Sequence, residues 1–223
     1  MTFTEFLEIV QTNGLRLDTK RSALLEQYAH LLKEQNGKVN LISRKDEENI
    51  FEKHLLHSLT LAMPEVTGFT IPNGASVFDV GTGGGLPGIP LAIVRDDITV
   101  TLCDSIAKKI KADEEMIDSL RLENVTAIIS RAEDLAKQKE FFGRFDIVVS
   151  RAVAPLDDLV KWTRGLLKKN GALLCLKGGD IQEEIKRTKR IKDVERVTEA
   201  PLALRGYNGF INDAKNIVTV LLG

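Results

Sequence analysis

The glycine-rich segment 79–88 constrains the fold of this chain more than any other part. It reads Asp-Val-Gly-Thr-Gly-Gly-Gly-Leu-Pro-Gly, follows an apolar run at 75–78 that is typical of a buried strand, and precedes an apolar run at 89–94 that is typical of a helix. Glycine lets another group approach the backbone closely, and the start of a helix presents unpaired N–H groups. A strand, a glycine loop and a helix in this order predict an α/β fold that holds a ligand at the loop.

Two classes of ligand are compatible with the glycine pattern. Gly83-x-Gly85-x-x-Gly88 fits the dinucleotide fingerprint, whereas the register that starts at Asp79 and continues through Gly81 fits the S-adenosylmethionine loop of methyltransferases. A carboxylate at the strand end disfavours a pyrophosphate beside it, but it suits a ligand that carries an ammonium and a sulfonium. The charge of Asp79 therefore favours S-adenosylmethionine over NAD, and we expect Gly81 and Gly83 to contact the cofactor.

Composition and length describe a globular protein without a disulfide or metal framework. The 223 residues, of which 43% are hydrophobic, suit one domain with an appendage. Because the formal net charge is −1, any binding of nucleic acid must come from a local patch. Cys103 and Cys175 lie in apolar strand-like runs and are predicted core residues, and no metal-ligand spacing is present. The lack of a signal peptide and of an apolar run of about 18 residues predicts a cytoplasmic protein that does not bind a membrane.

The chain divides into two predicted regions near residue 70. Residues 1–70 show helical periodicity without a convincing strand, which predicts an N-terminal helical cap. Residues 71–223 alternate between short apolar runs and amphipathic stretches, which predicts a parallel sheet covered by helices on both faces. The expected strands are 76–80, 99–104, 125–130, 145–151, 171–177, 194–204 and 216–222, and the expected helices are 88–95, 106–121, 155–168 and 180–190. This pattern predicts the Rossmann-like class I methyltransferase fold, with a mostly parallel seven-stranded sheet.

The carboxyl ends of the predicted strands supply candidate site residues, because ligands of doubly wound sheets bind there. Asp104 ends the second strand at a distance from Gly81 close to the ~20 residues expected for an acid that binds a ribose hydroxyl. The alternative is that Asp104 or Ser105 caps the helix that follows. Ala132 and Glu133 follow the third strand, and we expect them beside the adenine; the alternative is a solvated turn or an acidic helix start.

An arginine stands where the fourth predicted strand ends. Burying a guanidinium without a partner is costly, so Arg151 needs a counter-group at this position. We expect Arg151 to contact the cofactor or the substrate, and the alternative is a structural ion pair with Asp79 or Asp146. The fifth strand ends at Lys177, which places another cation at the same edge of the sheet.

These motifs together resemble a known bacterial family, the small-subunit rRNA guanine-N7 methyltransferases, also called glucose-inhibited division protein B. The resemblance runs along most of the chain, and its most specific part is Leu-Pro-Gly-Ile-Pro-Leu-Ala at 86–92. It also includes 40–43, His54 with Ser58-Leu59, Asp104-Ser105 with Lys108-Lys109, 131–133, 150–152 and 176–178. Two positions depart from the family pattern: His57 stands where an acid is usual, and Ala112-Asp113 stands where Phe-Leu is frequent.

The resemblance implies S-adenosyl-L-methionine as methyl donor and a guanine in a loop of 16S rRNA, in the small ribosomal subunit, as acceptor. It places cofactor contacts at Gly81, Leu86, Ala132, Glu133 and Arg151. Guanine N7 has an exposed lone pair and needs no deprotonation, so we expect alignment of the reactants to dominate and no catalytic residue. We further expect a monomer without a bound metal ion.

The surface that would meet RNA is predicted only in outline. One basic cluster is Lys108, Lys109 and Lys111; a second is Lys186, Arg187, Lys189, Arg190 and Lys192, interleaved with acids that are typical of a solvated helix face. The aromatic residues of loop 205–210 either stack on a base or belong to an ordinary turn. His54 and His57 lie three apart on one predicted helix, where they either contact rRNA or pack in the core.

Three other classes of function are compatible with a nucleoside-binding loop. An NAD(H)-dependent oxidoreductase is disfavoured, because neither Tyr28 nor Tyr207 is followed four residues later by the lysine of the commonest catalytic pair. A binding module would hold a nucleoside without turnover. A methyltransferase with a small molecule or a protein as acceptor is the alternative that the sequence opposes least.

Overall fold

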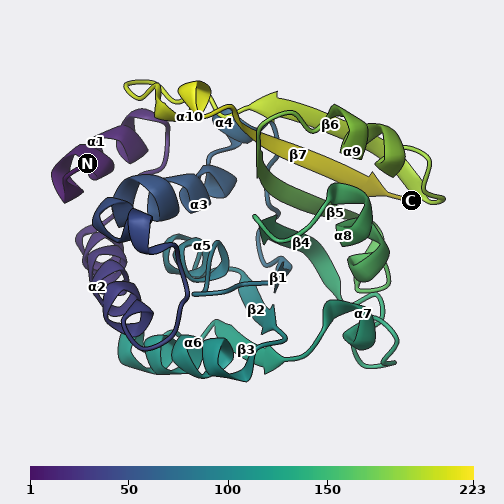
Figure 1. Cartoon of the computed structure of the whole chain (residues 1–223), viewed down its shortest axis with the longest axis horizontal. Helices are drawn as coiled ribbons and strands as arrows, with labels where there is room; N and C mark the ends of the chain where they lie inside the picture. Colours follow the sequence, from purple (N-terminus) through teal and green to yellow (C-terminus); the bar gives the residue numbers. More distant parts are fainter.

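The centre of the molecule is one seven-stranded sheet, seen in a computed structural model that describes all residues from 1 to 223 (Figure 1). Its strands are β1 (Ser76–Val80), β2 (Thr99–Asp104), β3 (Val125–Ile129), β4 (Phe145–Arg151), β5 (Leu167–Gly178), β6 (Val194–Pro201) and β7 (Lys215–Leu222). Their order across the sheet is β3-β2-β1-β4-β5-β7-β6. Strands β1 to β5 run parallel, and β7 runs antiparallel to both of its neighbours. The predicted class I methyltransferase sheet is confirmed.

Helices cover both faces of the sheet because successive strand residues point to opposite sides. In β1, Val77 joins a core cluster with α5 (Gly88–Val94) and α6 (Ala107–Leu120). Its neighbour Phe78 joins a second cluster on the opposite face. The helices of that face are α7 (Ala132–Leu135), α8 (Leu156–Thr163) and α9 (Gln182–Thr188).

The first 67 residues form helices and no strand. They are α1 (Phe3–Thr12), α2 (Thr19–Asn36), the 3₁₀-helix η1 (Arg44–Asn49), the π-helix η2 (Ile50–Leu56), α3 (His57–Leu59), the 3₁₀-helix η3 (Thr60–Ala62) and α4 (Pro64–Thr67). Thr2 and Glu5 form a capping box at the start of α1. Figure 1 shows α2 beside α5 and α6, and its buried residues belong to the same core cluster as the sheet. The boundary near residue 70 stays a prediction, because the core runs across it without interruption.

Most predicted elements lie within two residues of the predicted bounds, but the strand predicted over 194–204 already ends at Pro201. Strands 76–80, 99–104 and 145–151 agree with the structure residue by residue. The helix predicted over 155–168 ends at Thr163, because Leu167 pairs with Phe145 and starts β5 earlier than expected. The short helix α7 was predicted only as an alternative and α10 (Gly209–Asn212) was not predicted, since one turn leaves no periodic signal. No helix combines the length and the apolar character that a membrane span would require.

Candidate functional site

The loop between β1 and α5 contains three glycines in the left-handed region of backbone conformation. The angle φ is +67° at Gly81, +65° at Gly83 and +80° at Gly85, values that other residues rarely adopt. A Cβ atom at Gly81 would lie 2.7 Å from a methyl carbon of Val153. The N–H of Gly81 donates to the carbonyl oxygen of Cys103 at 2.8 Å, which ties the loop to the end of β2. The loop therefore presents bare backbone at the carboxyl edge of the sheet.

Asp79 lies beneath this loop and lines neither of the cavities beside it. Its side chain is fully buried, and Oδ2 accepts hydrogen bonds from Oγ1 of Thr82 at 2.7 Å and from the N–H of Gly88 at 2.9 Å. Burial raises the pKa of Asp79 to about 7, while the two hydrogen bonds oppose that rise. Asp79 therefore braces the loop and does not line the cavities where a ligand would bind, and an effect of its charge on the choice of ligand stays a prediction.

Two cavities meet at the glycine loop. The larger has a volume of about 950 Å³ and reaches from the loop to η2 and to the ends of β4 and β5. The smaller, of about 340 Å³, lies by the ends of β2 and β3. Gly81, Lys109, Ala152 and Val153 line both cavities, so these residues stand where the two spaces adjoin. The pair suits an elongated ligand with two unlike ends.

All seven residues predicted to bind the cofactor line this pair of cavities. The smaller one is lined by Asp104, Ala132 and Glu133, the larger one by Gly83, Leu86 and Arg151, and both by Gly81. The parallel topology produces this convergence, because it brings the carboxyl ends of β1, β2, β3 and β4 to one edge. Contact with a cofactor itself stays a prediction for each residue.

Asp104 ties the glycine loop to the turn after β2. Its Oδ1 accepts from the N–H of Ile106 at 2.9 Å, and its Oδ2 accepts from the N–H of Gly83 at 3.2 Å. The N-cap residue of α6 is Ile106, and no side chain caps that helix. The alternative in which Asp104 or Ser105 caps the helix is therefore wrong, whereas the ribose prediction stays.

Ala132 and Glu133 form the first turn of α7, directly after β3. The Ala132 side chain is buried, and the Glu133 carboxylate is partly exposed at 3.9 Å from the guanidinium of Arg131. Glu133 is thus an acid at a helix start, as in the alternative interpretation. It also lines the smaller cavity, as the adenine prediction requires.

Arg151, at the end of β4, makes no ion pair with a carboxylate. Its Nη1 donates to the carbonyl oxygen of Lys53 at 3.1 Å, and its Nη2 lies 2.9 Å from Nδ1 of His54. The proposed alternative partners are engaged elsewhere, since Asp146 pairs with Lys168 and Asp79 braces the loop. The ion-pair alternative is wrong. A half-buried guanidinium without an anion thus lines the larger cavity.

His54 and His57 are both buried, as the packing alternative predicts, and both line the larger cavity. Burial and the nearby charge of Arg151 lower the pKa of His54 to about 3, and burial lowers the pKa of His57 well below its ordinary value. Both imidazoles are therefore neutral near pH 7. Their Nε2 atoms have no hydrogen-bond partner.

The predicted RNA-contact groups differ in their surroundings. Lys186 pairs with Glu183 and Arg187 pairs with Asp157, so these two residues belong to a solvated, internally paired face. In contrast, Lys109 forms no ion pair and lines both cavities.

The aromatic residues of loop 205–210 are occupied within the protein. Phe210 is 1% exposed and packs against His57, with ring centroids 5.1 Å apart. The hydroxyl of Tyr207 donates to a carboxylate oxygen of Glu52 at 2.7 Å. The structure therefore supports the ordinary-turn alternative rather than a platform for a base.

Three residues of the site escaped prediction. Tyr28 of α2 donates its hydroxyl to the carbonyl oxygen of Gly84 at 2.6 Å and so fixes the glycine loop from the N-terminal region. Val153 stands above Gly81 on the turn after β4. The carbonyl of Lys53 reaches Arg151 across the cavity. None has a local signal, because each contact joins segments far apart in sequence.

Asp113, one of the two departures from the family pattern, is fully buried in α6. Neither carboxylate oxygen has a hydrogen-bond partner, and burial raises the pKa of Asp113 well above its ordinary value. Asp113 lines neither cavity, in agreement with an effect on packing alone. The structure groups no three His, Cys, Asp or Glu side chains in a manner that could hold a metal ion.

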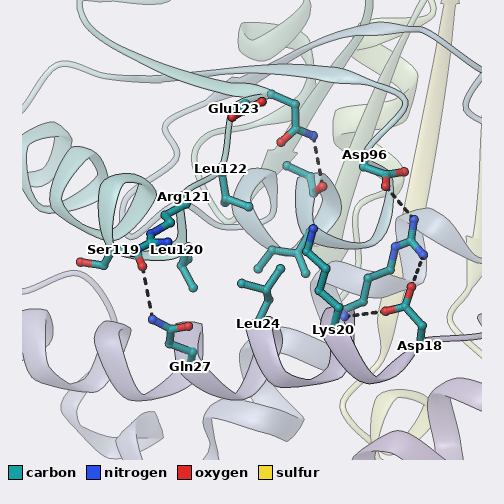
Figure 2. A pocket seen from close by; sticks show the side chains of 14 residues that line it. Asp18, Lys20, Leu24, Gln27, Asp96, Ser119, Leu120, Arg121, Leu122 and Glu123 are labelled. Atoms are coloured by element: carbon teal, nitrogen blue, oxygen red, sulfur yellow. Dashed lines mark hydrogen bonds and ion pairs between the residues drawn. The ribbon is translucent and has the colours of Figure 1, made fainter.

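A further cavity of about 740 Å³ lies away from the carboxyl edge, between α2 and the segment after α6 (Figure 2). One of its arginines is paired with two acids: Arg21 lies 2.7 Å from Asp18 and 2.9 Å from Asp96. Gln27 donates to the carbonyl oxygen of Ser119 at 3.3 Å across the cavity. This cavity contains none of the predicted site residues.

Solved structures share the fold of this chain at low sequence identity. A SAM-dependent O-methyltransferase from Thermotoga maritima is similar with a TM-score of 0.55 at 16% identity, over 86% of this chain and 71% of that one. A complex between the Haloferax volcanii Trm112 methyltransferase activator and a methyltransferase gives a TM-score of 0.60 at 12% identity, over 80% of this chain and 94% of that one. At such identities the likeness shows the fold alone.

Sequence comparison is more specific. The model of the family GidB, rRNA small subunit methyltransferase G, matches residues 21–205. The ribosomal RNA small subunit methyltransferase G of Chlorobium luteolum is 46% identical over 179 residues, which are 80% of this chain and 71% of the relative. That of Chlorobium limicola is 42% identical over 214 residues, 95% of this chain and 93% of the relative. The chain belongs to the rRNA small subunit methyltransferase G family.

Proposed function

We propose that this protein transfers a methyl group from S-adenosyl-L-methionine to N7 of one guanine in the 16S rRNA of the small ribosomal subunit. Membership of the family gives the class of reaction and the class of acceptor. The observation that carries the proposal is the pair of cavities that adjoin at Gly81, on the edge where doubly wound sheets bind ligands. An NAD(H)-dependent oxidoreductase does not agree with membership of this family.

The side chains of the two cavities fit the two ends of S-adenosylmethionine. In the smaller cavity, Asp104 would hold the ribose hydroxyls, and Ala132 with Glu133 would lie along the adenine. In the larger cavity, Arg151 would hold the carboxylate of the methionyl group, because it is a half-buried cation without an anion. Between them, Gly81 offers backbone without a side chain, so a ligand can pass close to it.

The chemistry asks little of the protein beyond alignment. The cofactor supplies a methyl group on a sulfonium, which is activated without help from the protein. Guanine N7 attacks with its exposed lone pair, so no side chain has to remove a proton first. Holding the two reactants in line can lower the barrier by roughly 7–11 kcal/mol in favourable cases. This agrees with a site in which the pKa of His54 is lowered to about 3 and that of His57 is lowered well below its ordinary value, so that both rings are poor bases.

Unpaired cations at the cavity walls support an RNA substrate. Lys109 and Lys215 line the larger cavity and form no ion pair with an acidic side chain, so both are free to meet phosphate groups. We expect the protein to act on the small subunit in the cytoplasm, as a monomer and without a metal ion.

The test is methyl transfer from labelled S-adenosylmethionine to 30S subunits from a strain that lacks this protein, with protein-free 16S rRNA in parallel. The modified base is then mapped. We expect label on N7 of a single guanine. Absence of label on both substrates, while the protein binds the cofactor, would contradict an rRNA acceptor.

A matched pair of glycine variants controls for folding. Gly81→Ala and Gly74→Ala both place a side chain at a left-handed position, with φ of +67° and +70°. At Gly74 nothing lies within 4 Å of the added Cβ, whereas at Gly81 it meets Val153. Only Gly81→Ala should abolish the label.

A further inference from the structure

The guanidinium of Arg151 is held on one side by two acceptors from the same short segment. Both the carbonyl oxygen of Lys53 and Nδ1 of His54 belong to the π-helix η2. A π-helix is rare, and its wider turn is found frequently at functional sites. Sequence periodicity predicts an ordinary helix here, so the change of winding coincides with the contact to Arg151.

The hydrogen bond fixes the tautomer of His54. A guanidinium has only donors, so Nδ1 of His54 must accept with its lone pair. The neutral imidazole then carries its proton on Nε2. Nε2 is buried without a partner, and the residue is 6% exposed, so the ring cannot exchange this arrangement for one satisfied by water.

We infer that His54 is a positioning residue for Arg151: its Nδ1 lone pair, with the Lys53 carbonyl, holds the guanidinium so that its remaining N–H groups are left for the carboxylate of the cofactor. The inference rests on the proposed function, because it takes S-adenosylmethionine as the ligand of Arg151. If Nδ1 carried a proton, its N–H would face an N–H of the guanidinium. If Nε2 were also protonated, the ring would be a cation beside the cation of Arg151. The pKa of His54, which burial and Arg151 lower to about 3, agrees with a permanently neutral ring.

Two substitutions of His54 test separately the loss of the hydrogen-bond acceptor and the loss of the aromatic ring. In His54→Asn the amide oxygen can occupy the position of Nδ1 and accept from Arg151. In His54→Phe the ring stays and the acceptor is lost. We expect His54→Phe to raise the Kd for S-adenosylmethionine about ten-fold, the value of one hydrogen bond to a charged group, and His54→Asn to stay within about two-fold of the wild type. Equal affinity of all three proteins, or equal loss in both variants, would overturn the inference.

Calorimetric titration of the wild type separates this inference from the proposed function. If the wild type does not bind S-adenosylmethionine, the proposed function fails. If it binds and His54→Phe binds equally well, only the role of His54 fails. A second readout needs no variant: nitrogen-15 spectra of the histidine rings in the wild type should show His54 unprotonated at Nδ1 and protonated at Nε2 throughout the neutral range. A His54 ring that is protonated at Nδ1 would overturn the inference even if a variant does not fold.

Discussion

The cavity pair at the carboxyl edge and the cavity of Figure 2 are both wide and are each lined by an arginine, but only one of the two arginines has acidic partners. In the Figure 2 cavity, Arg21 has Asp18 and Asp96 as partners within ion-pair distance. At the carboxyl edge, Arg151 has only neutral acceptors, and the Nε2 atom of His54 has no partner. Arg21 therefore has anions at its guanidinium, whereas Arg151 has none and keeps donors for a ligand.

The comparison teaches that volume alone does not separate these cavities. The Figure 2 cavity holds about 740 Å³, a value between those of the two cavities at the glycine loop, about 950 Å³ and about 340 Å³. A cation that is partly removed from water and has no anion is costly, so a protein retains one mainly where a ligand supplies the missing charge. The predictions below test this distinction, from the largest effect to the smallest.

Gly81→Ala should weaken the binding of S-adenosylmethionine by about 100-fold, since the new methyl group meets Val153 at the junction of the two cavities. Titration calorimetry with Gly74→Ala as control measures this effect. The control should bind like the wild type, although both variants carry the same left-handed strain. Similar affinities of the two variants would mean that the ligand does not pass over Gly81.

Arg151→Met should raise the Kd for S-adenosylmethionine about 30-fold, because charge-assisted hydrogen bonds to a carboxylate are lost. The matched change in the other cavity, Arg21→Met, should leave the Kd within about two-fold. Competition binding with S-adenosylhomocysteine measures the Kd of both variants in the same assay. If Arg21→Met has the larger effect, the assignment of the two cavities must be exchanged.

Asp113→Leu tests a buried carboxyl group that has no hydrogen-bond partner and lies outside both cavities at the glycine loop. Both carboxylate oxygens of Asp113 are buried without a partner, so their removal should raise the free energy of unfolding by about 1–3 kcal/mol. Urea denaturation measures the change, and the Kd for S-adenosylmethionine should not move. A destabilised variant would indicate that Asp113 has a partner in solution.

The neutral state of His54 predicts a small dependence of stability on pH. The unfolded chain protonates this imidazole near pH 6.5, while the folded protein does so only near pH 3, so the unfolded state binds more protons between these values. Stability therefore falls as the pH decreases through this window. His54→Phe lacks this loss, so between about pH 7.5 and about pH 5.5 it should gain about 1 kcal/mol relative to the wild type.

Urea denaturation of both proteins at the two pH values checks that difference. Asp79, whose pKa is raised to about 7, acts in the opposite direction but is common to both proteins and cancels. A difference that does not change with pH would mean that His54 is protonated as easily in the folded protein as in the unfolded chain.

The sequence predicted the smaller cavity better than the larger one. Asp104, Ala132 and Glu133 follow strands whose apolar runs are clear, and parallel pairing then brings them to one edge. The position of the Asp79 side chain beneath the loop could also have been predicted from the sequence. Strand residues two apart share a face, and Val77 belongs to the core that α5 covers, so Asp79 had to point beneath the loop.

The larger cavity depends on contacts that no local pattern encodes. Arg151 meets His54 and Lys53 across 97 and 98 positions of sequence, and the π-winding of η2 has no periodic signature of its own. The same holds for Tyr28, which reaches Gly84 across 56 positions. Sequence reasoning could state that Arg151 needs a partner, but only the packing of the N-terminal helices shows that the partner is an imidazole.

A crystal structure of this protein with S-adenosylhomocysteine tests the central claim most directly. The account predicts adenosine density beside Asp104 and Ala132, and the carboxylate of the ligand on Arg151, while the Figure 2 cavity stays free of ligand. Density in the Figure 2 cavity, or a ligand at the glycine loop whose carboxylate lies away from Arg151, would contradict it.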